Sequence, residues 1–309
     1  MGNDKDKKLS LNQQIDDLKK KGVRFEIMSE AQARTFLEYN TYYFKLKSYL
    51  KAFDSGNIDF AYLRELSTLD YHFRKTIISM ALDIEHLLKV KLIRDVMYDD
   101  TEDGYQIVSV FFKHHADIKD GLKKNARNSA VEGITPDDPD NMSVWNLTEL
   151  LQLREFMELY YTYYTLKGDP GNQLRTVELC TQSLRYLRNA AAHNACLLST
   201  LKDEDLEKVN EAVYDAVDDL GLYSTKVLDK KMYCRTMHDF VSMIYLFCML
   251  TDDEALSKMR GFTLSAISDK LHDRFVYHRD YFKCSSFLAS NYEFITKLID
   301  HLKENNFSF

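Results

Sequence analysis

The sequence has 309 residues, of which 3 are Pro, 10 are Gly and 45% are hydrophobic. So few helix-breaking residues favour long helices, and the hydrophobic fraction is enough for a substantial core. The formal net charge of −7 argues against a general binder of polyanions, because non-specific affinity for nucleic acids depends on Lys and Arg side chains facing phosphates. The longest nearly unbroken apolar run, residues 240–250, is too short for the roughly 20 residues that span a bilayer. It predicts a buried helix and no membrane partner.

The sequence also bears on the cellular location of the protein, the state of its cysteines and its capacity to bind metals or cofactors. The polar first residues lack the apolar core of a signal peptide, so we expect a cytoplasmic protein. The 5 cysteines are scattered and never form a C-x-x-C pair, which predicts reduced thiols rather than disulfides or zinc ligands. Adjacent His114 and His115 point apart on a helix without a carboxylate shell, so no metal site is expected. The sequence also lacks the glycine-rich motifs for nucleotides and dinucleotides, and no cofactor is predicted.

Apolar residues that recur every three or four positions predict an all-α fold. A first amphipathic helix is expected over 9–22, with Ser10 and Gln13 as a capping box, and Ser29 is expected to cap a second helix. Residues 42–53 alternate aromatic and basic side chains, which suits either base stacking with phosphate contacts or an ordinary core with solvated hydroxyl groups. A turn at 54–57 then precedes a long helix over about 60–98.

Residues 99–142 form an insertion-like polar segment that holds most of the turn-forming residues and two of the three prolines. Further helices are predicted over 144–166, 173–198, 204–220, 231–250 and 264–275. The sequence contains no low-complexity linker, so we expect one all-α domain over 1–309, with 200–309 as a helical C-terminal extension.

The strongest candidate for chemistry is the segment 184–194, which carries Arg188 and His193. A guanidinium can hold a phosphate and an imidazole can move a proton near neutral pH, so the pair could cleave a phosphodiester without a metal. On a straight helix the two side chains are about 140° apart, so either the helix ends or bends there, or two copies of the segment complete one site. Asn189 lies one turn before His193 and could fix the imidazole tautomer. The alternative is an exposed helix end without chemistry.

Two further features bear on binding. The small spacer Ala190 to Ala192 allows another backbone, from protein or RNA, to come close. The first third of the chain is locally basic, which fits either a groove for a specific RNA or solvated helix faces. The basic residues that we single out there are Lys45, Lys47, Arg74 and Lys89.

Read in order, these segments resemble the Abi family of abortive-infection proteins, in its AbiD/AbiF-like group within the HEPN superfamily. The resemblance depends on the sequence and spacing of five motifs, at 14–22, 43–49, 70–74, 84–89 and 188–193. The last is the family's R-N-x-x-x-H signature, formed here by Arg188, Asn189 and His193.

The chain departs from the family pattern at four positions. Lys21, Lys45 and Lys89 stand where the family has Arg, which keeps the charge but gives up bidentate phosphate geometry. Asn194 stands where the family often has a second His.

The resemblance implies a HEPN-type helical bundle with additional N- and C-terminal helices, usually a homodimer in which the signature segments of two protomers face each other. It implies a metal-independent endoribonuclease toxin of phage defence, in which the RNA 2′-hydroxyl attacks the adjacent phosphate. His193 would act as general base or acid, Arg188 would stabilise charge on the phosphorane, and Asn189 would orient groups around it. The candidates for binding RNA are Asn194, Arg185, Lys45, Lys47, Tyr43, Arg74 and Lys89.

A second interpretation stays open at this point. The chain could be a non-catalytic HEPN module that binds RNA or protein, and an inhibitory small antitoxin RNA could hold it. The acidic net charge, the Arg-to-Lys departures and the absence of the second His favour this alternative.

Overall fold

The computed structural model describes residues 8–54, 58–127, 141–168, 173–201, 205–277, 279–282, 285–305 and 309. The described residues form helices joined by turns, apart from an isolated bridge between Arg24 and Asp59, so the all-α prediction is confirmed. None of the described helices is both long and apolar enough to cross a membrane. The chain divides into two compact units, one of residues 1–80 with 183–309 and one of residues 81–182.

The first unit begins with α1 (Leu11–Lys20), α2 (Glu30–Tyr39), α3 (Tyr43–Ser48) and the 3-10 helix η2 (Tyr49–Ala52). Ser10 and Ser29 each cap their helix through the predicted kind of capping box, with Gln three residues later. The two short helices α1 and α2 pack against each other. These capping residues explain why both helices start where the sequence predicted.

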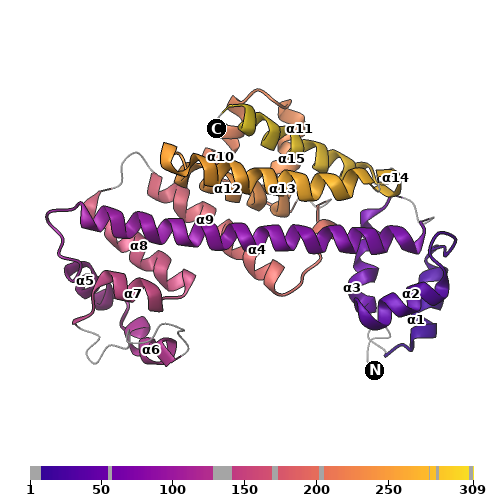
Figure 1. The fold of residues 1–309 in the computed structure, drawn as a ribbon, viewed down its shortest axis with the longest axis horizontal. Coiled ribbons are helices and arrows are strands. Elements are labelled where there is room, and N and C mark those ends of the chain that lie inside the picture. The colour runs from indigo at the N-terminus through magenta and orange to yellow at the C-terminus, as the bar shows by residue number, and fades with distance from the viewer. Residues whose placement is uncertain are drawn as a thin grey trace. The chain divides into compact units, whose positions relative to one another are not determined.

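A single unbroken helix, α4 (Phe60–Met97), follows and gives its residues up to Met80 to the first unit (Figure 1). Its first residue, Phe60, is fully buried and contacts the rings of Phe25 and Phe36. Asp59 accepts three backbone N–H groups from residues 26–28, which fixes the loop between α1 and α2 against the start of α4. The long helix predicted over 60–98 is therefore confirmed.

The rest of the first unit begins with the end of α9 (Gln173–Ala192), from Ser183 onward. The helices that follow are α10 (Glu211–Asp219), α11 (Thr225–Met232), α12 (Arg235–Leu250), η6 (Glu254–Leu256), α13 (Ser257–Tyr277), α14 (Arg279–Phe282) and α15 (Ser286–Glu304). Almost every residue of α12 from Thr236 to Cys248 is buried, as the apolar run predicted. Phe240 of α12 meets Phe73 of α4 edge to face, with ring centroids 4.9 Å apart. The helix α12 therefore forms the centre of this unit.

The second unit contains α5 (Gln106–His114), α6 (Ala116–Arg127), α7 (Val144–Leu150), α8 (Leu153–Lys167), the end of α4 and the start of α9 (Gln173–Ala192). Two tyrosines of α8 donate to carboxylates at or just beyond the end of α4: Tyr164 donates to Asp95 and Tyr163 to Asp99, two residues after the helix. Within the segment predicted as an insertion, residues 106–114 and 116–127 are helical and 128–140 lie outside the described residues.

Five predicted helices have other boundaries in the structure. The helix predicted over 204–220 is shorter, since residues 205–210 are not helical and α10 begins at Glu211, and the helix predicted over 264–275 is longer, since α13 spans Ser257–Tyr277. The helix predicted over 144–166 is interrupted at residues 151–152, because Gln152 takes an extended backbone and caps α8 through Glu155. The helix predicted over 231–250 is two helices, with extended Cys234 as the N-cap of α12. The helix predicted to end at residue 198 ends at Ala192, followed by the 3-10 helix η5 (Leu197–Ser199). This last difference shapes the candidate site.

Candidate functional site

The C-terminal end of α9 is a Schellman motif. The backbone N–H of Ala195 donates to the carbonyl of Ala190 at 2.9 Å, and that of Asn194 donates to Ala191 at 3.1 Å. Asn194 has a φ of 61°, the left-handed conformation that this motif requires and that Gly usually provides. It is the one non-glycine residue with positive φ among those that the structure describes. The helix therefore ends at Ala192 with His193 as its C-cap, and the Arg188–His193 segment comprises the last turn of α9 and this cap.

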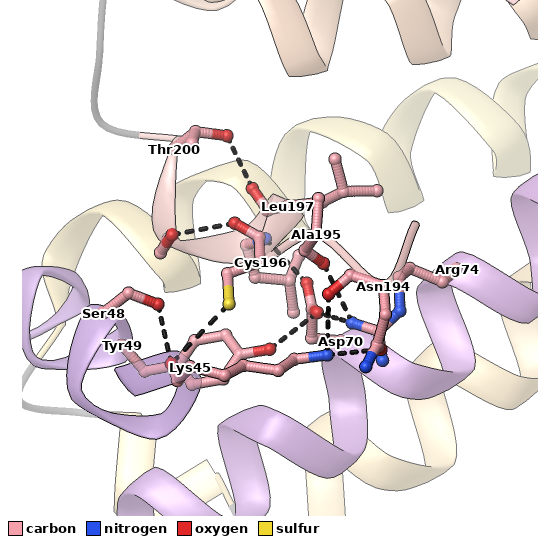
Figure 2. Close-up of polar contacts among 12 residues, drawn as sticks. Lys45, Ser48, Tyr49, Asp70, Arg74, Asn194, Ala195, Cys196, Leu197 and Thr200 are labelled. Atoms are coloured by element: carbon pink, nitrogen blue, oxygen red, sulfur yellow. Dashed lines mark hydrogen bonds and ion pairs between the residues drawn. The ribbon is translucent and has the colours of Figure 1, made fainter. Parts of the chain in front are cut away.

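Lys45 of α3 holds Asn194 in this conformation (Figure 2). Its ammonium group donates to the main-chain carbonyl oxygen of Asn194 at 2.9 Å and also to the side-chain oxygen Oδ1 of the same residue. The Lys45 side chain is only 6% exposed, and the main-chain carbonyl of Lys45 accepts from Ser48 and Cys196. A residue nearly 150 positions earlier in the chain thus fixes the turn that ends α9.

Asp70 and Arg74 of α4 hold the next residues of the same turn. Arg74 is paired with Asp70 and donates to the carbonyl oxygen of Ala195 at 3.1 Å. Asp70, which is fully buried, accepts the backbone N–H of Leu198 at 2.8 Å and the hydroxyl of Tyr49 at 2.7 Å. We call Lys45, Tyr49, Asp70 and Arg74 the anchor, because together they fix residues 194–198 (Figure 2).

The charges of the anchor suit the end of a helix. Lys45 and Arg74 lie against the carboxyl end of α9, where the helix dipole is negative and cations are stabilising. Burial, and to a smaller extent the neighbouring Arg74, lowers the pKa of Lys45 to about 8. The two cations and one carboxylate leave one net positive charge just beneath the turn.

The three signature residues are exposed at the end of α9. Arg188 lies on the surface and donates to Oδ1 of Asn189 at 3.3 Å, a long contact. The side chain of His193 is exposed and, among the described residues, makes no hydrogen bond or ion pair. Within one chain the structure therefore does not join Arg188 to His193, which agrees with the angle of about 140° expected from the helix.

The other predicted RNA-binding residues occupy different surroundings. Tyr43 is buried and donates to Asp17, and Lys47 lies near Asp17 at 3.8 Å and over the ring of Tyr43. Burial and the contact with Asp17 raise the pKa of Tyr43. In the second unit, Lys89 pairs with Glu85 at 3.4 Å and lies over the ring of Phe156. Tyr43, Lys47 and Lys89 thus contact other side chains of the same chain.

Arg185, half-buried on α9, has no hydrogen-bond or ionic partner among the described residues. It is therefore available on the same helix as the signature residues. Sequence reasoning did not single out Tyr49 or the backbone groups of 195–198 as parts of the site. The signals for this anchor were the motifs at 43–49 and 70–74, which contain Tyr49, Asp70 and Arg74, but the sequence predicts RNA binding for Arg74 and not a contact with the turn.

The arrangement separates two tasks. Buried residues from α3, η2 and α4 fix the backbone, and the exposed residues of α9 are free to contact a ligand. An imidazole at the surface can accept or donate a proton, and a guanidinium can bind and neutralise an anionic oxygen. This chemistry suits the transfer of a phosphodiester, provided that both groups reach the same phosphate.

Comparison with known proteins adds one match. A family model described as Abi-like protein matches residues 35–199, which is more than half of the chain. The matched region starts in α2 and ends in η5, so it includes the whole anchor and all three signature residues. Neither the curated proteins nor the solved structures yielded a match.

Proposed function

Since the chain belongs to the family of Abi-like proteins, which connects it with abortive infection as a defence against phage, we propose that it is a metal-independent endoribonuclease of such a system. The proposal places the active site at the end of α9 and takes it to be of the HEPN type. Its substrate is RNA, and its partner is a second copy of the chain.

One observation carries the proposal. Arg188, Asn189 and His193 lie exposed at the end of a helix whose last turn is fixed by buried residues of the same family region. A helix end without a function needs no such anchor, because a Gly in the Schellman motif would end α9 without buried cations. Positioning of exposed groups by a rigid, buried support is typical of catalytic sites.

The reaction uses the RNA itself as nucleophile. His193 removes the proton of the 2′-hydroxyl, a bond forms between O2′ and phosphorus, and the bond between phosphorus and O5′ breaks. A protonated imidazole returns a proton to the leaving O5′, so the products carry a 2′,3′-cyclic phosphate and a 5′-hydroxyl. Arg188 stabilises the charge that develops on the phosphorane oxygens, and Asn189 holds that guanidinium through its amide oxygen.

A two-fold pair of chains would solve the geometric problem. Within one α9 the Arg188 and His193 side chains point in different directions, but two antiparallel copies bring Arg188 of one chain towards His193 of the other. The alanines at 190–192 permit such a close approach, since 191 is buried and 190 and 192 have little bulk. The proposed enzyme is therefore a homodimer with two composite sites.

The test is cleavage of labelled RNA by purified protein in EDTA, with His193→Ala and Arg188→Ala as the variants. His193→Ala is expected to lose at least about 100-fold in rate, since general acid–base catalysis contributes that much. Arg188→Ala is expected to lose a similar factor of at least about 100, because it removes the charge that stabilises the phosphorane. The matched controls are Arg175→Ala on the same helix and His114→Ala on α5, which remove the same side-chain types at positions in the second unit. Both control variants should cleave RNA at the wild-type rate.

Three results would speak against the proposal. Undiminished cleavage by both signature variants refutes the residue assignment. Activity only after addition of Mg²⁺ or Mn²⁺ refutes a metal-independent mechanism. Tight binding of RNA without any 2′,3′-cyclic product would instead support the alternative of a non-catalytic RNA-binding module that a small antitoxin RNA holds.

A further inference from the structure

The side chain of Asn194 has a fixed orientation, which follows from the chemistry of Lys45. A lysine ammonium group carries three donors and no acceptor. Lys45 lies against the carboxamide of Asn194, so the amide oxygen has to face it and the amide NH₂ group has to face away. The contact with Lys45 alone thus determines that the amide oxygen of Asn194 points inward.

The amide NH₂ group is therefore presented outward. Asn194 is exposed, and its Nδ2 has no acceptor among the described residues. It follows His193 directly in the chain and belongs to the same turn. A rigid N–H donor thus lies next to the exposed imidazole.

The electrostatic surroundings favour an anion at this donor. Lys45 and Arg74 bring two buried positive charges under the turn and Asp70 brings one negative charge, so one positive charge remains. This excess more than offsets the roughly half negative charge at the carboxyl end of α9. The guanidinium groups of Arg185 and Arg188 on the last two turns of α9 add exposed or half-exposed positive charge.

We propose that Asn194 is a substrate-binding residue that donates a hydrogen bond from its amide NH₂ group to a phosphate oxygen of single-stranded RNA, and that Lys45 is the positioning residue that orients this amide. The inference deepens the proposed function and rests on it for the identity of the ligand. Lys45 thereby acts on RNA binding indirectly, through Asn194, because its ammonium group donates to groups inside the protein and does not contact RNA.

Two substitutions at Asn194 separate this role from a purely structural one. Asn194→Gly keeps the left-handed turn, because Gly adopts positive φ without cost, but it removes the donor. Asn194→Asp also tolerates the turn and gains an ion pair with Lys45, but it replaces the outward NH₂ with a carboxylate oxygen. If Asn194 has only a structural role, Asn194→Asp should bind RNA at least as tightly as Asn194→Gly. If Asn194 is a donor to RNA, Asn194→Asp should bind RNA more weakly than Asn194→Gly.

The readouts are the Kd for a fluorescent, random-sequence 2′-O-methyl RNA 20-mer, which cannot be cleaved by its own 2′-hydroxyl, and the rate of cleavage of the unmodified RNA. We expect Asn194→Gly to bind about tenfold more weakly, which corresponds to one hydrogen bond to a charged group. Asn194→Asp should bind more weakly still, and the ratio of the Kd values of the two variants should fall at high salt, because salt screens the repulsion between the new carboxylate and the RNA phosphates. Equal or tighter binding by Asn194→Asp than by Asn194→Gly overturns the proposal.

Lys231 provides a matched control for Lys45. It is also a buried lysine of the first unit, 4% exposed, its ammonium group donates to Ser290 and to Oδ1 of Asn291, and burial lowers its pKa to about 8. Lys45→Met and Lys231→Met should lower the urea midpoint by similar amounts. Only Lys45→Met should also weaken RNA binding by folded protein, and an equal loss in both variants overturns the positioning role.

The failures of the two proposals can be told apart. If the wild-type chain binds the 2′-O-methyl RNA but does not cleave RNA, the nuclease proposal fails and the order of the Asn194 variants still decides the inference. If the chain cleaves RNA but the Asn194 variants bind normally, only the inference fails. A wild-type chain that binds no RNA overturns both.

Discussion

Substitution of Asp70 by alanine tests whether the anchor supports the fold as strongly as its geometry indicates. Asp70 is fully buried and accepts from three donors, which belong to Arg74, Tyr49 and the backbone of Leu198. Removing one partner of a buried ion pair costs about 3 to 5 kcal/mol, because the remaining charge is left in a low-dielectric environment. The two other donors lose their acceptor at the same time, and since these costs overlap we expect the loss to lie at the upper end of that range.

The assay is urea unfolding followed by far-UV circular dichroism. With an m value of about 3 kcal/mol per M, a loss of about 4 to 5 kcal/mol lowers the urea midpoint of Asp70→Ala by about 1.3 to 1.7 M. Tyr49→Phe, which removes one hydrogen bond and leaves Asp70 paired with Arg74, should cost about 1.5 kcal/mol.

Glu85→Ala is the matched control, because it breaks the Glu85–Lys89 pair, which has the same i, i+4 spacing on the same helix but is about one-fifth exposed on each side. It should cost less than about 1 kcal/mol. If Asp70→Ala is no more destabilising than Glu85→Ala, the reasoning about the anchor is refuted.

Two further predictions concern stability alone. Burial lowers the folded-state pKa values of Lys45 and Lys231 to about 8, so between about pH 8 and 9 the unfolded chain binds more protons than the folded chain. The urea midpoint of the wild-type chain should therefore rise with pH in this window, and that of Lys45→Met should rise less steeply. A wild-type midpoint that falls between pH 8 and 9 would contradict this reasoning. Gly104→Ala should destabilise the second unit by more than about 1 to 2 kcal/mol, because Gly104 has a φ of +81° and the new Cβ would lie 2.4 Å from the Trp145 ring. Gly121→Ala, in an open position of α6, is the control and should stabilise the unit by about 0.5 to 1 kcal/mol. The fluorescence of Trp145, the only tryptophan, reports the unfolding of both variants, and unchanged stability of Gly104→Ala would contradict the predicted clash.

The sequence predicted those parts of the fold that short-range signals determine. The starts of α1 and α2 follow from Ser and Gln at fixed spacing, and the length of α4 follows from its apolar period and the absence of Gly and Pro. The buried helix at 235–250 follows from its apolar composition. Each of these signals lies within the element that it predicts.

The end of α9 could not be predicted in this way. Ala190 to Ala192 favour a helix, and nothing nearby in the sequence shows that Asn194 takes a left-handed conformation. The groups that hold it, Lys45 and Arg74, come from helices more than 100 residues earlier. For the same reason the sequence does not show that these cations face inward, while Arg188 and His193 face solvent.

The distance along the chain between the anchor and the turn has a consequence for biosynthesis. The contacts of Lys45, Arg74 and Asp70 with residues 194–198 close loops of 149, 121 and 128 residues. Contacts of such high order form late, after the intervening helices have emerged from the ribosome and collapsed. A nascent or prematurely terminated chain that stops before residue 194 therefore cannot arrange this end of α9, and the ribonuclease activity that we propose for it requires translation of the family region to be complete.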